Sequence, residues 1–92
     1  MNVQAVRIVI SGMVQGVGYR YFAYRAATNL GLAGWVRNRP DGAVEIEAEG
    51  DRSLLQALID GLKVGPRSAV VKGVDVKWLP TSGKHKSFEV RF

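Results

Sequence analysis

The sequence predicts an α+β fold of the ferredoxin-like βαββαβ type, with two helices on one face of an antiparallel sheet and a short fifth strand at the C-terminal end. Two observations support it. Strand-like and helix-like apolar spacings follow one another in the order strand, helix, strand, strand, helix, strand, strand. A helix between the first two strands and another between the third and fourth imply right-handed crossovers, which bring both helices to the same face. The chain has 92 residues, 47% of them hydrophobic, so we expect residues 1–92 to form one domain around one core.

The first strand and the first helix flank a glycine-rich loop. Residues 6–10 place Val6, Ile8 and Ile10 on one face of a strand that we expect to end at Ser11-Gly12. After the loop, an apolar stripe with helical spacing stops at Gly31, the expected left-handed residue after a helix. The stripe consists of Tyr19, Phe22, Ala23, Ala26, Ala27 and Leu30. Arg20 lies off this stripe, so we expect it to face the loop.

A hairpin and a second helix follow. Residues 34–38 predict a strand, and the Arg39-Pro40-Asp41-Gly42 turn leads into another strand over residues 43–49. Asp51 has the position of a helix N-cap, and the helix is expected to end near Gly65-Pro66. Its predicted buried face consists of Leu54, Leu55, Leu58, Ile59 and Leu62.

The last part of the chain predicts two strands. Residues 70–79 have the pattern of a fourth strand, and residues 87–92 that of a short fifth, with Phe88, Val90 and Phe92 on one face. Between them, residues 80–86 are polar and are expected to form a loop.

Charge and composition narrow the functional classes. Thirteen Lys and Arg against eight Asp and Glu give a net charge of +5, which favours anionic ligands. Four arginines are expected near one small site: Arg20, Arg25, Arg37 and Arg39. The chain has no cysteine and no segment long enough to span a membrane, so we predict a cytoplasmic protein with no membrane partner.

Nucleic acid is not the expected partner. The strand at residues 43–49 carries glutamate at alternate positions, which would repel a polyanion lying across the sheet. RNA-binding sheets of this type usually carry basic and aromatic residues there instead. Trp35 and Trp78 lie in strand patterns, so we expect them in the core and not as stacking platforms for bases.

Residues 12–20, Gly-Met-Val-Gln-Gly-Val-Gly-Tyr-Arg, are the strongest candidate for a binding site. Gly16 and Gly18 allow successive N–H groups to turn toward one point, the following helix end adds unpaired amides, and Arg20 adds a planar fork of donors suited to phosphate. The glycine spacing matches neither the nucleotide-triphosphate loop nor the dinucleotide fingerprint. From the spacing alone, an anion-binding loop and a simple tight connection remain equally open.

The residues themselves resemble a more specific pattern. Ile10-x-Gly12-x-Val14-Gln15-Gly16-Val17-x-Tyr19-Arg20 resembles the first signature of the acylphosphatase family. Gly34-Trp35-Val36-Arg37-Asn38-x-x-x-Gly42-x-Val44, followed by Gly50, resembles the second. The two motifs have the family's order, and the resemblance covers the whole chain. One position departs from it, because the family usually has Phe or Met where this chain has Tyr19, whose hydroxyl needs a partner if it is buried.

This resemblance implies a metal-independent hydrolase that cleaves the carboxyl-phosphate bond of an acylphosphate to a carboxylate and inorganic phosphate, without a cofactor. Arg20 and Asn38 would be the catalytic residues, with Asn38 orienting the attacking water. The implied phosphate-binding residues are Gln15, Gly16, Val17, Gly18, Tyr19 and Arg20. Without the resemblance, Asn38 is more simply interpreted as a turn former that hydrogen-bonds its own backbone.

The implied partners are a small-molecule acylphosphate, as substrate, and inorganic phosphate, as product and inhibitor. We expect a monomer. Two other functions remain open: a phosphate-binding module without turnover, and a partner-binding domain like the acylphosphatase-like segment of the hydrogenase-maturation carbamoyl transferases. Measured turnover separates the first of these from an enzyme.

Other polar residues have simpler interpretations. His85, the only histidine, lies in the polar loop between two lysines, and we expect a solvated surface side chain and not a general base. Glu45, Glu47 and Glu49 are expected to form a solvated strand face and not a cation site, so we predict no metal.

Overall fold

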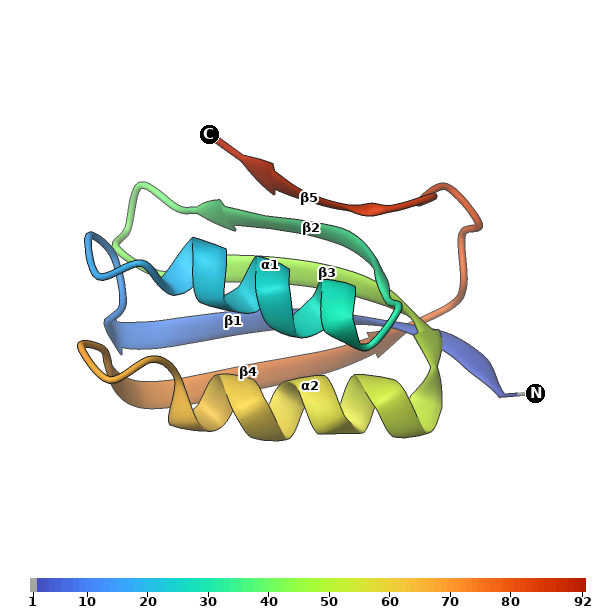
Figure 1. Ribbon diagram of the computed structural model, residues 1–92, viewed down its shortest axis with the longest axis horizontal. Coiled ribbons are helices and arrows are strands. Elements are labelled where there is room, and N and C mark those ends of the chain that lie inside the picture. Colours follow the sequence, from blue (N-terminus) through green and yellow to red (C-terminus); the bar gives the residue numbers. More distant parts are fainter. Residues whose placement is uncertain (1) are drawn as a thin grey trace.

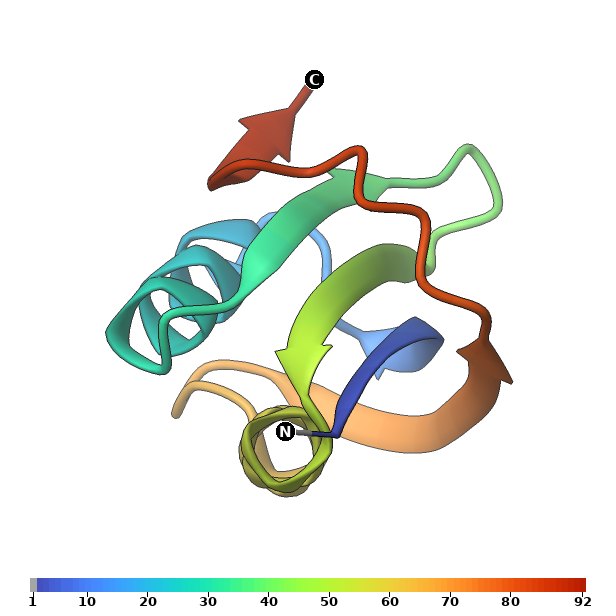
Figure 2. The same cartoon turned by 90° about the vertical axis from the view of Figure 1, so that its right-hand side faces the viewer.

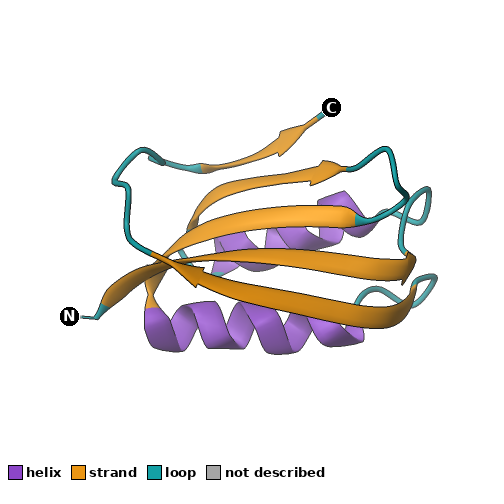
Figure 3. Cartoon of the chain, turned by 180° about the vertical axis from the view of Figure 1, so that it is seen from behind, coloured by secondary structure: helices purple, strands orange, loops and turns teal. Residues whose placement is uncertain are grey.

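The computed structural model describes residues 2–92 and contains a five-stranded sheet with both helices on one of its faces (Figure 1). The elements are β1 (Val3–Met13), α1 (Tyr19–Asn29), β2 (Ala33–Asn38), β3 (Val44–Asp51), α2 (Arg52–Val64), β4 (Val70–Leu79) and β5 (Phe88–Arg91). The strand order is β4-β1-β3-β2-β5, and neighbours are antiparallel except β2 and β5. The view from behind shows the other face of the sheet free of helices (Figure 3). The predicted α+β, ferredoxin-like fold is confirmed.

β5 pairs in parallel with β2, with Gly34 opposite Phe88 and Val36 opposite Val90. The pairing is parallel because the chain leaves β4 at one edge of the sheet and crosses to the opposite edge before β5 begins (Figure 1). The C-terminal end of β5 therefore lies beside the end of β2, where Asn38 is the last strand residue.

β1 continues to Met13, beyond the Ser11-Gly12 end that the sequence predicted. Its register against β4 shifts between Ser11 and Gly12, which is a β-bulge that lets pairing continue past the glycine. Gly12 has φ of 126°, and a Cβ there would collide with the carbonyl oxygen of Val70. Glycine is therefore required at this close approach, just before the chain enters the loop at residues 14–18.

The core fills the space between the helices and one face of the sheet (Figure 2). The buried helix residues are Tyr19, Ala23 and Ala27 on α1 and Leu55, Leu58, Ile59 and Leu62 on α2. Two predicted signals are confirmed: Gly31 has φ of 69° after α1, and Asp51 caps α2 by accepting a hydrogen bond from the Ser53 amide at 2.9 Å. Leu54 was predicted in the buried face but is 38% exposed, because it lies in the first turn at the edge of the stripe.

The glutamates of β3 face away from the helices, as predicted, but they are not a solvated surface. Glu45 is only 6% exposed and lies between Arg37, at 2.7 Å, and Arg7, at 3.6 Å. Glu47 contacts Arg7 at 3.2 Å. Glu49 accepts hydrogen bonds from the backbone amides of residues 82 and 83. The expectation of solvation was wrong because neighbouring strands and the 80–86 loop supply cations and amides that cover this face.

His85 corrects a second expectation. Its side chain is 12% exposed, and its Nε2 lies 2.8 Å from a carboxylate oxygen of Glu47. The residue is not a solvated surface histidine, because the loop that carries it folds over the open face of the sheet. The carboxylate partner that the sequence did not suggest comes from 38 residues away.

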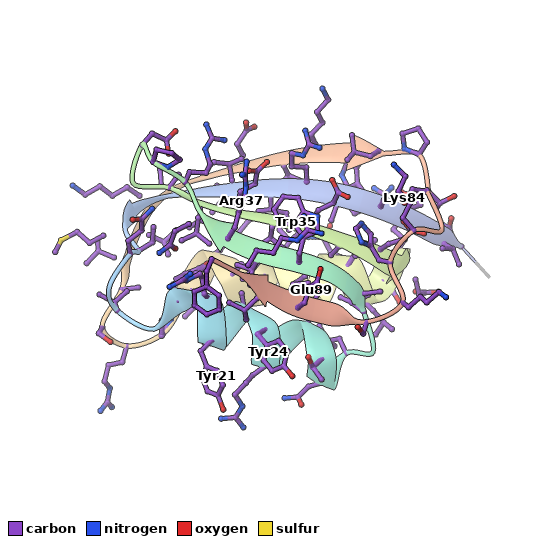
Figure 4. The ribbon with its side chains drawn as sticks, turned by 90° about the horizontal axis from the view of Figure 1, so that it is seen from above. Tyr21, Tyr24, Trp35, Arg37, Lys84 and Glu89 are labelled. Atoms are coloured by element: carbon purple, nitrogen blue, oxygen red, sulfur yellow. The ribbon has the colours of Figure 1, made fainter. Side chains whose placement is uncertain are left out.

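The two tryptophans lie on different faces. Trp78 packs against the core, whereas Trp35 is buried on the open face, under the guanidinium groups of Arg37 and Arg91 at 5.6 and 4.9 Å from its ring centre. Figure 4 shows Trp35 and Arg37 on β2, with Glu89 on the neighbouring β5. Of the helices in residues 2–92, none has the length and apolarity that a membrane crossing requires.

Candidate functional site

A cavity of about 290 Å³ opens at one end of the sheet, where the 14–18 loop, the first turn of α1 and the ends of β2 and β5 meet. The loop, the end of β2 and the end of β5 lie together at the left of Figure 1. The wall consists of Val14, Gly16, Gly18, Tyr19, Arg20, Tyr21, Asn38, Val90 and Phe92. Segments from the beginning, the middle and the end of the chain therefore form one site.

The loop has the backbone conformation that its glycines predicted. Gly16 and Gly18 have φ of 75° and 79°, and a Cβ on either residue would meet nothing within 4 Å. Glycine is needed here for the left-handed conformation and not for space. Gly18 is the N-cap of α1 and supplies no side-chain hydrogen bond, and the first turn has no acidic residue. The unpaired amides and the positive end of the helix dipole are thus available to an anion.

Arg20 lies on the cavity wall, but its contacts are with the C-terminal end of the chain. Its Nη1 donates to the Arg91 carbonyl at 3.2 Å, and its guanidinium carbon lies 4.7 Å from the centre of the Phe92 ring. A guanidinium has five N–H donors, so these contacts leave donors for an anion in the cavity. The stacked ring and the carbonyl also restrict the orientation of the side chain.

Only one of the four arginines expected near the site lines this cavity. Arg37 lies on the opposite face of the sheet with Glu45. Arg39 pairs with Asp41 at 2.9 Å inside the turn. Arg25 is not among the residues of the cavity wall, although it lies 5.9 Å from the ring centre of the wall residue Tyr21, which projects from α1 away from the sheet (Figure 4). The local positive charge of the cavity therefore comes from Arg20 and the helix end.

Asn38 reaches the cavity because it ends β2, on the same face as buried Val36. The turn that follows is held by other groups: the Asp41 carboxylate accepts from the Ala43 amide at 3.1 Å, and the Arg39 amide donates to the Ala43 carbonyl at 2.8 Å. The hydrogen bond from Ala43 lowers the pKa of the exposed Asp41 carboxyl. Within residues 2–92 the Asn38 side chain has no hydrogen-bond partner, so Asp41 and not Asn38 has the role of turn former.

The Tyr19 hydroxyl has the partner that its burial requires. The side chain is 1% exposed, and the hydroxyl donates to the Leu62 carbonyl of α2 at 2.6 Å. Burial raises the pKa of this phenol well above its ordinary value of 10.0, so it remains a neutral donor. The departure from the usual Phe or Met is therefore accommodated by a bond between the two helices.

Two of the predicted phosphate-binding residues lie in the loop but do not line the cavity. Val17 packs against the core, and its carbonyl accepts a hydrogen bond from Ser68 at 3.5 Å. The side chain of Gln15 instead bonds the β2–β3 turn, a contact that no signal in the sequence indicated. The residues 2–92 contain no group of three His, Cys, Asp or Glu side chains arranged to hold a metal ion.

Comparisons with known proteins agree on one family. The family model described as Acylphosphatase matches residues 6–90. An acylphosphatase from Anaeromyxobacter dehalogenans is 49% identical, over 94% of this chain and 92% of the relative, and one from Acaryochloris marina is 49% identical over 97% and 95%. The crystal structure of acylphosphatase from Bacillus subtilis superposes with a TM-score of 0.93 at 39% identity, covering 97% of this chain and 99% of that one. Full-length HypF, in a phosphate- and nucleotide-bound form, matches with a TM-score of 0.87 at 30% identity, over 99% of this chain but only 12% of HypF.

Proposed function

Since the chain belongs to the acylphosphatase family and is thereby a hydrolase of acylphosphates, we propose how it does so: the 15–20 amides and Arg20 hold the phosphoryl group, and Asn38 positions the attacking water. The reaction cleaves the carboxyl-phosphate bond to give a carboxylate and inorganic phosphate. The oxygen of the water forms a bond to phosphorus as the bond between phosphorus and the carboxylate oxygen breaks.

This reaction asks little of side-chain chemistry. A carboxylate is a good leaving group, so it departs without a strong general acid. The requirements that remain are a water in line with the breaking bond and positive groups around the three phosphoryl oxygens. A cavity with glycine amides, a helix end and one arginine on its wall suits the second requirement.

The observation that carries the proposal is that Arg20 and Asn38 share this wall although they come from different motifs. Asn38 suits the water role because its amide can accept one hydrogen bond and donate others, and the turn beside it uses the Asp41 carboxylate instead. His85 faces Glu47 on the other side of the sheet and supplies no base to the cavity. A phosphoryl oxygen of the substrate is then the acceptor for the proton of the water.

The remaining site assignments follow from the resemblance of the 12–20 motif to the family signature, not from the cavity wall. Gln15, Val17 and Tyr19 contribute backbone amides to the proposed phosphate site, beside Gly16 and Gly18. One copy of the chain supplies the loop, Arg20 and Asn38 that the mechanism needs, and we propose that the protein acts as a monomer with residues 1–92 as one domain. No metal or other cofactor takes part in the proposed mechanism.

Asn38→Ala tests the assignment of the water. If Asn38 positions water, kcat for benzoyl phosphate should fall by about two decades. The affinity for inorganic phosphate should stay within a few-fold, because the phosphate cradle, which is the 15–20 amides with Arg20, lies in another part of the chain. Single-turnover kinetics and a phosphate titration on the same variant measure the two effects. Asn29→Ala, at the end of α1 and outside this cavity, is the matched control. An unchanged kcat in Asn38→Ala would leave the water without its proposed holder.

A further inference from the structure

The side chain of Gln15 joins the two motifs of the site. Its Nε2 donates to the Arg39 carbonyl at 2.8 Å and to the Ala43 carbonyl at 2.9 Å, 24 and 28 residues further along the chain. A glutamine amide has two N–H donors, and both are used here. Because the Arg39 amide also bonds the Ala43 carbonyl, the Gln15 amide spans the mouth of the turn between β2 and β3.

These two bonds connect opposite sides of the cavity wall. Gln15 directly precedes Gly16, and Arg39 directly follows Asn38. Among residues 2–92, no other hydrogen bond joins the 14–18 loop to the 39–43 turn. Three of the turn residues, Pro40, Asp41 and Gly42, are exposed and gain little support from packing. Asn38 is paired with Val44 in the sheet, and within residues 2–92 the Gln15 side chain supplies the only hydrogen bonds that fix the 14–18 loop against the turn beside Asn38.

We propose that Gln15 is a positioning residue for the hydrolysis: its side-chain amide clamps the β2–β3 turn to the phosphate loop and so holds Asn38 at the right distance from the phosphoryl group. The inference rests on the proposed role of Asn38. In-line attack is sensitive to position, and a displacement of about 1 Å can cost about a hundredfold in rate. The side chain of Gln15 affects kcat through Asn38. The backbone amide of residue 15 belongs to the phosphate cradle and remains there when the side chain is changed.

A double-mutant cycle tests this coupling. Gln15→Ala should lower kcat at least about tenfold and change the inhibition constant of inorganic phosphate less than about threefold. In the Asn38→Ala background, the same substitution should have almost no further effect on kcat, because the side chain that positions the water is already absent. Gln56→Ala, an exposed glutamine of α2 whose amide bonds Asp60, should leave kcat unchanged and is the control.

Two further variants test the clamp through the pH dependence of kcat, which a merely structural role of Gln15 would not change. In Gln15→Glu, a carboxylate faces two carbonyl oxygens without a donor, and protonation restores one O–H donor. The ratio of its kcat to that of the wild type should therefore rise as the pH is lowered from about 8 to about 5. The turn that Gln15 bonds carries the paired charges of Arg39 and Asp41, and Arg20 lies on the cavity wall formed by the same loop. Gln15→Met, of similar shape but without a donor, should show a low ratio at every pH.

The outcomes separate the clamp from the role of Asn38. Effects of Gln15→Ala and Asn38→Ala that multiply independently would overturn the clamp and leave Asn38 as the holder of water. A full kcat in Asn38→Ala would instead refute the proposed role of Asn38 in the hydrolysis, and the clamp with it. A ratio for Gln15→Glu that does not change with pH, or that Gln15→Met reproduces, would also overturn the clamp.

Discussion

Replacement of Tyr19 by Phe should destabilise the protein without impairing catalysis. The hydroxyl donates to the Leu62 carbonyl at 2.6 Å in a buried setting. In a continuing helix that carbonyl would accept from the amide of residue 66, but residue 66 is Pro66, which has no N–H. The Tyr19 hydroxyl thus replaces the missing helical hydrogen bond, and Tyr19→Phe leaves the carbonyl without a partner.

The expected magnitude follows from that geometry. A buried acceptor left unpaired costs about 1 to 3 kcal/mol, and the loss of one hydroxyl group creates no large cavity. For a domain of this size, 1 kcal/mol lowers Tm by about 4 to 8 °C, so a loss near 2 kcal/mol corresponds to about 8 to 16 °C. The hydroxyl points to α2, so kcat for benzoyl phosphate at 25 °C should stay within about twofold.

Urea unfolding followed by tryptophan fluorescence measures the free energy of unfolding in wild type and variant. Tyr21→Phe, on the same helix but 62% exposed, is the matched control and should change this free energy by less than about 0.5 kcal/mol. Equal stabilities of Tyr19→Phe and Tyr21→Phe would refute the reasoning, because the Leu62 carbonyl would then have found another partner. A tenfold loss of kcat in Tyr19→Phe would show that the hydroxyl acts in the cavity.

Three further predictions concern the site and the open face of the sheet. Arg20→Ala should lower kcat by about two to three decades, since a transition-state charge contact is worth about 3 to 4 kcal/mol. Arg20→Lys should not restore kcat, because an ammonium lacks the planar fork of donors, and near wild-type turnover in this variant would contradict the proposed role of Arg20. Inorganic phosphate should inhibit competitively and, at a hundred times its Kd, stabilise the fold by about 2.7 kcal/mol in thermal unfolding. EDTA should leave kcat unchanged, and activity that is lost in EDTA and restored by a divalent cation would reveal a metal requirement. Desolvation raises the pKa of Glu47, but hydrogen bonds from His85 and Arg7 outweigh it and lower the pKa below the ordinary 4.5. The stabilisation by Glu47 is therefore present above pH 4.5 and lost as the pH falls through the folded-state pKa. In urea titrations, the free energy of unfolding of Glu47→Gln should therefore fall less at acid pH than that of the wild type. An identical dependence on pH in the two proteins would contradict this assignment.

Much of the fold was predictable because its signals are local. Period-two alternation in β1 and β3 and the helical stripes of α1 and α2 directly report which side chains are buried, so element type and order follow from the sequence. Backbone signals are local too: the φ of Gly16 and Gly18 and the cap at Asp51 depend on residues within one turn. The motifs that indicated the family are likewise continuous stretches, so the fold and the family could both be predicted from the sequence.

The contacts of the candidate site were decided by the tertiary structure. Arg20 bonds a carbonyl 71 residues away, Tyr19 one 43 residues away, and Gln15 two carbonyls of a turn in the other motif. The expectation of a solvated His85 was wrong for the same reason, since its partner Glu47 lies on a different strand. Such contacts depend on strand register, on the bulge in β1 and on the crossing of the chain to β5, none of which a local pattern encodes. The sequence by itself determined which residues form helices and strands and which loop can bind an anion. Only the packed sheet decided which polar groups bond one another, because hydrogen bonds form within about 3 Å and that proximity is set by the whole fold.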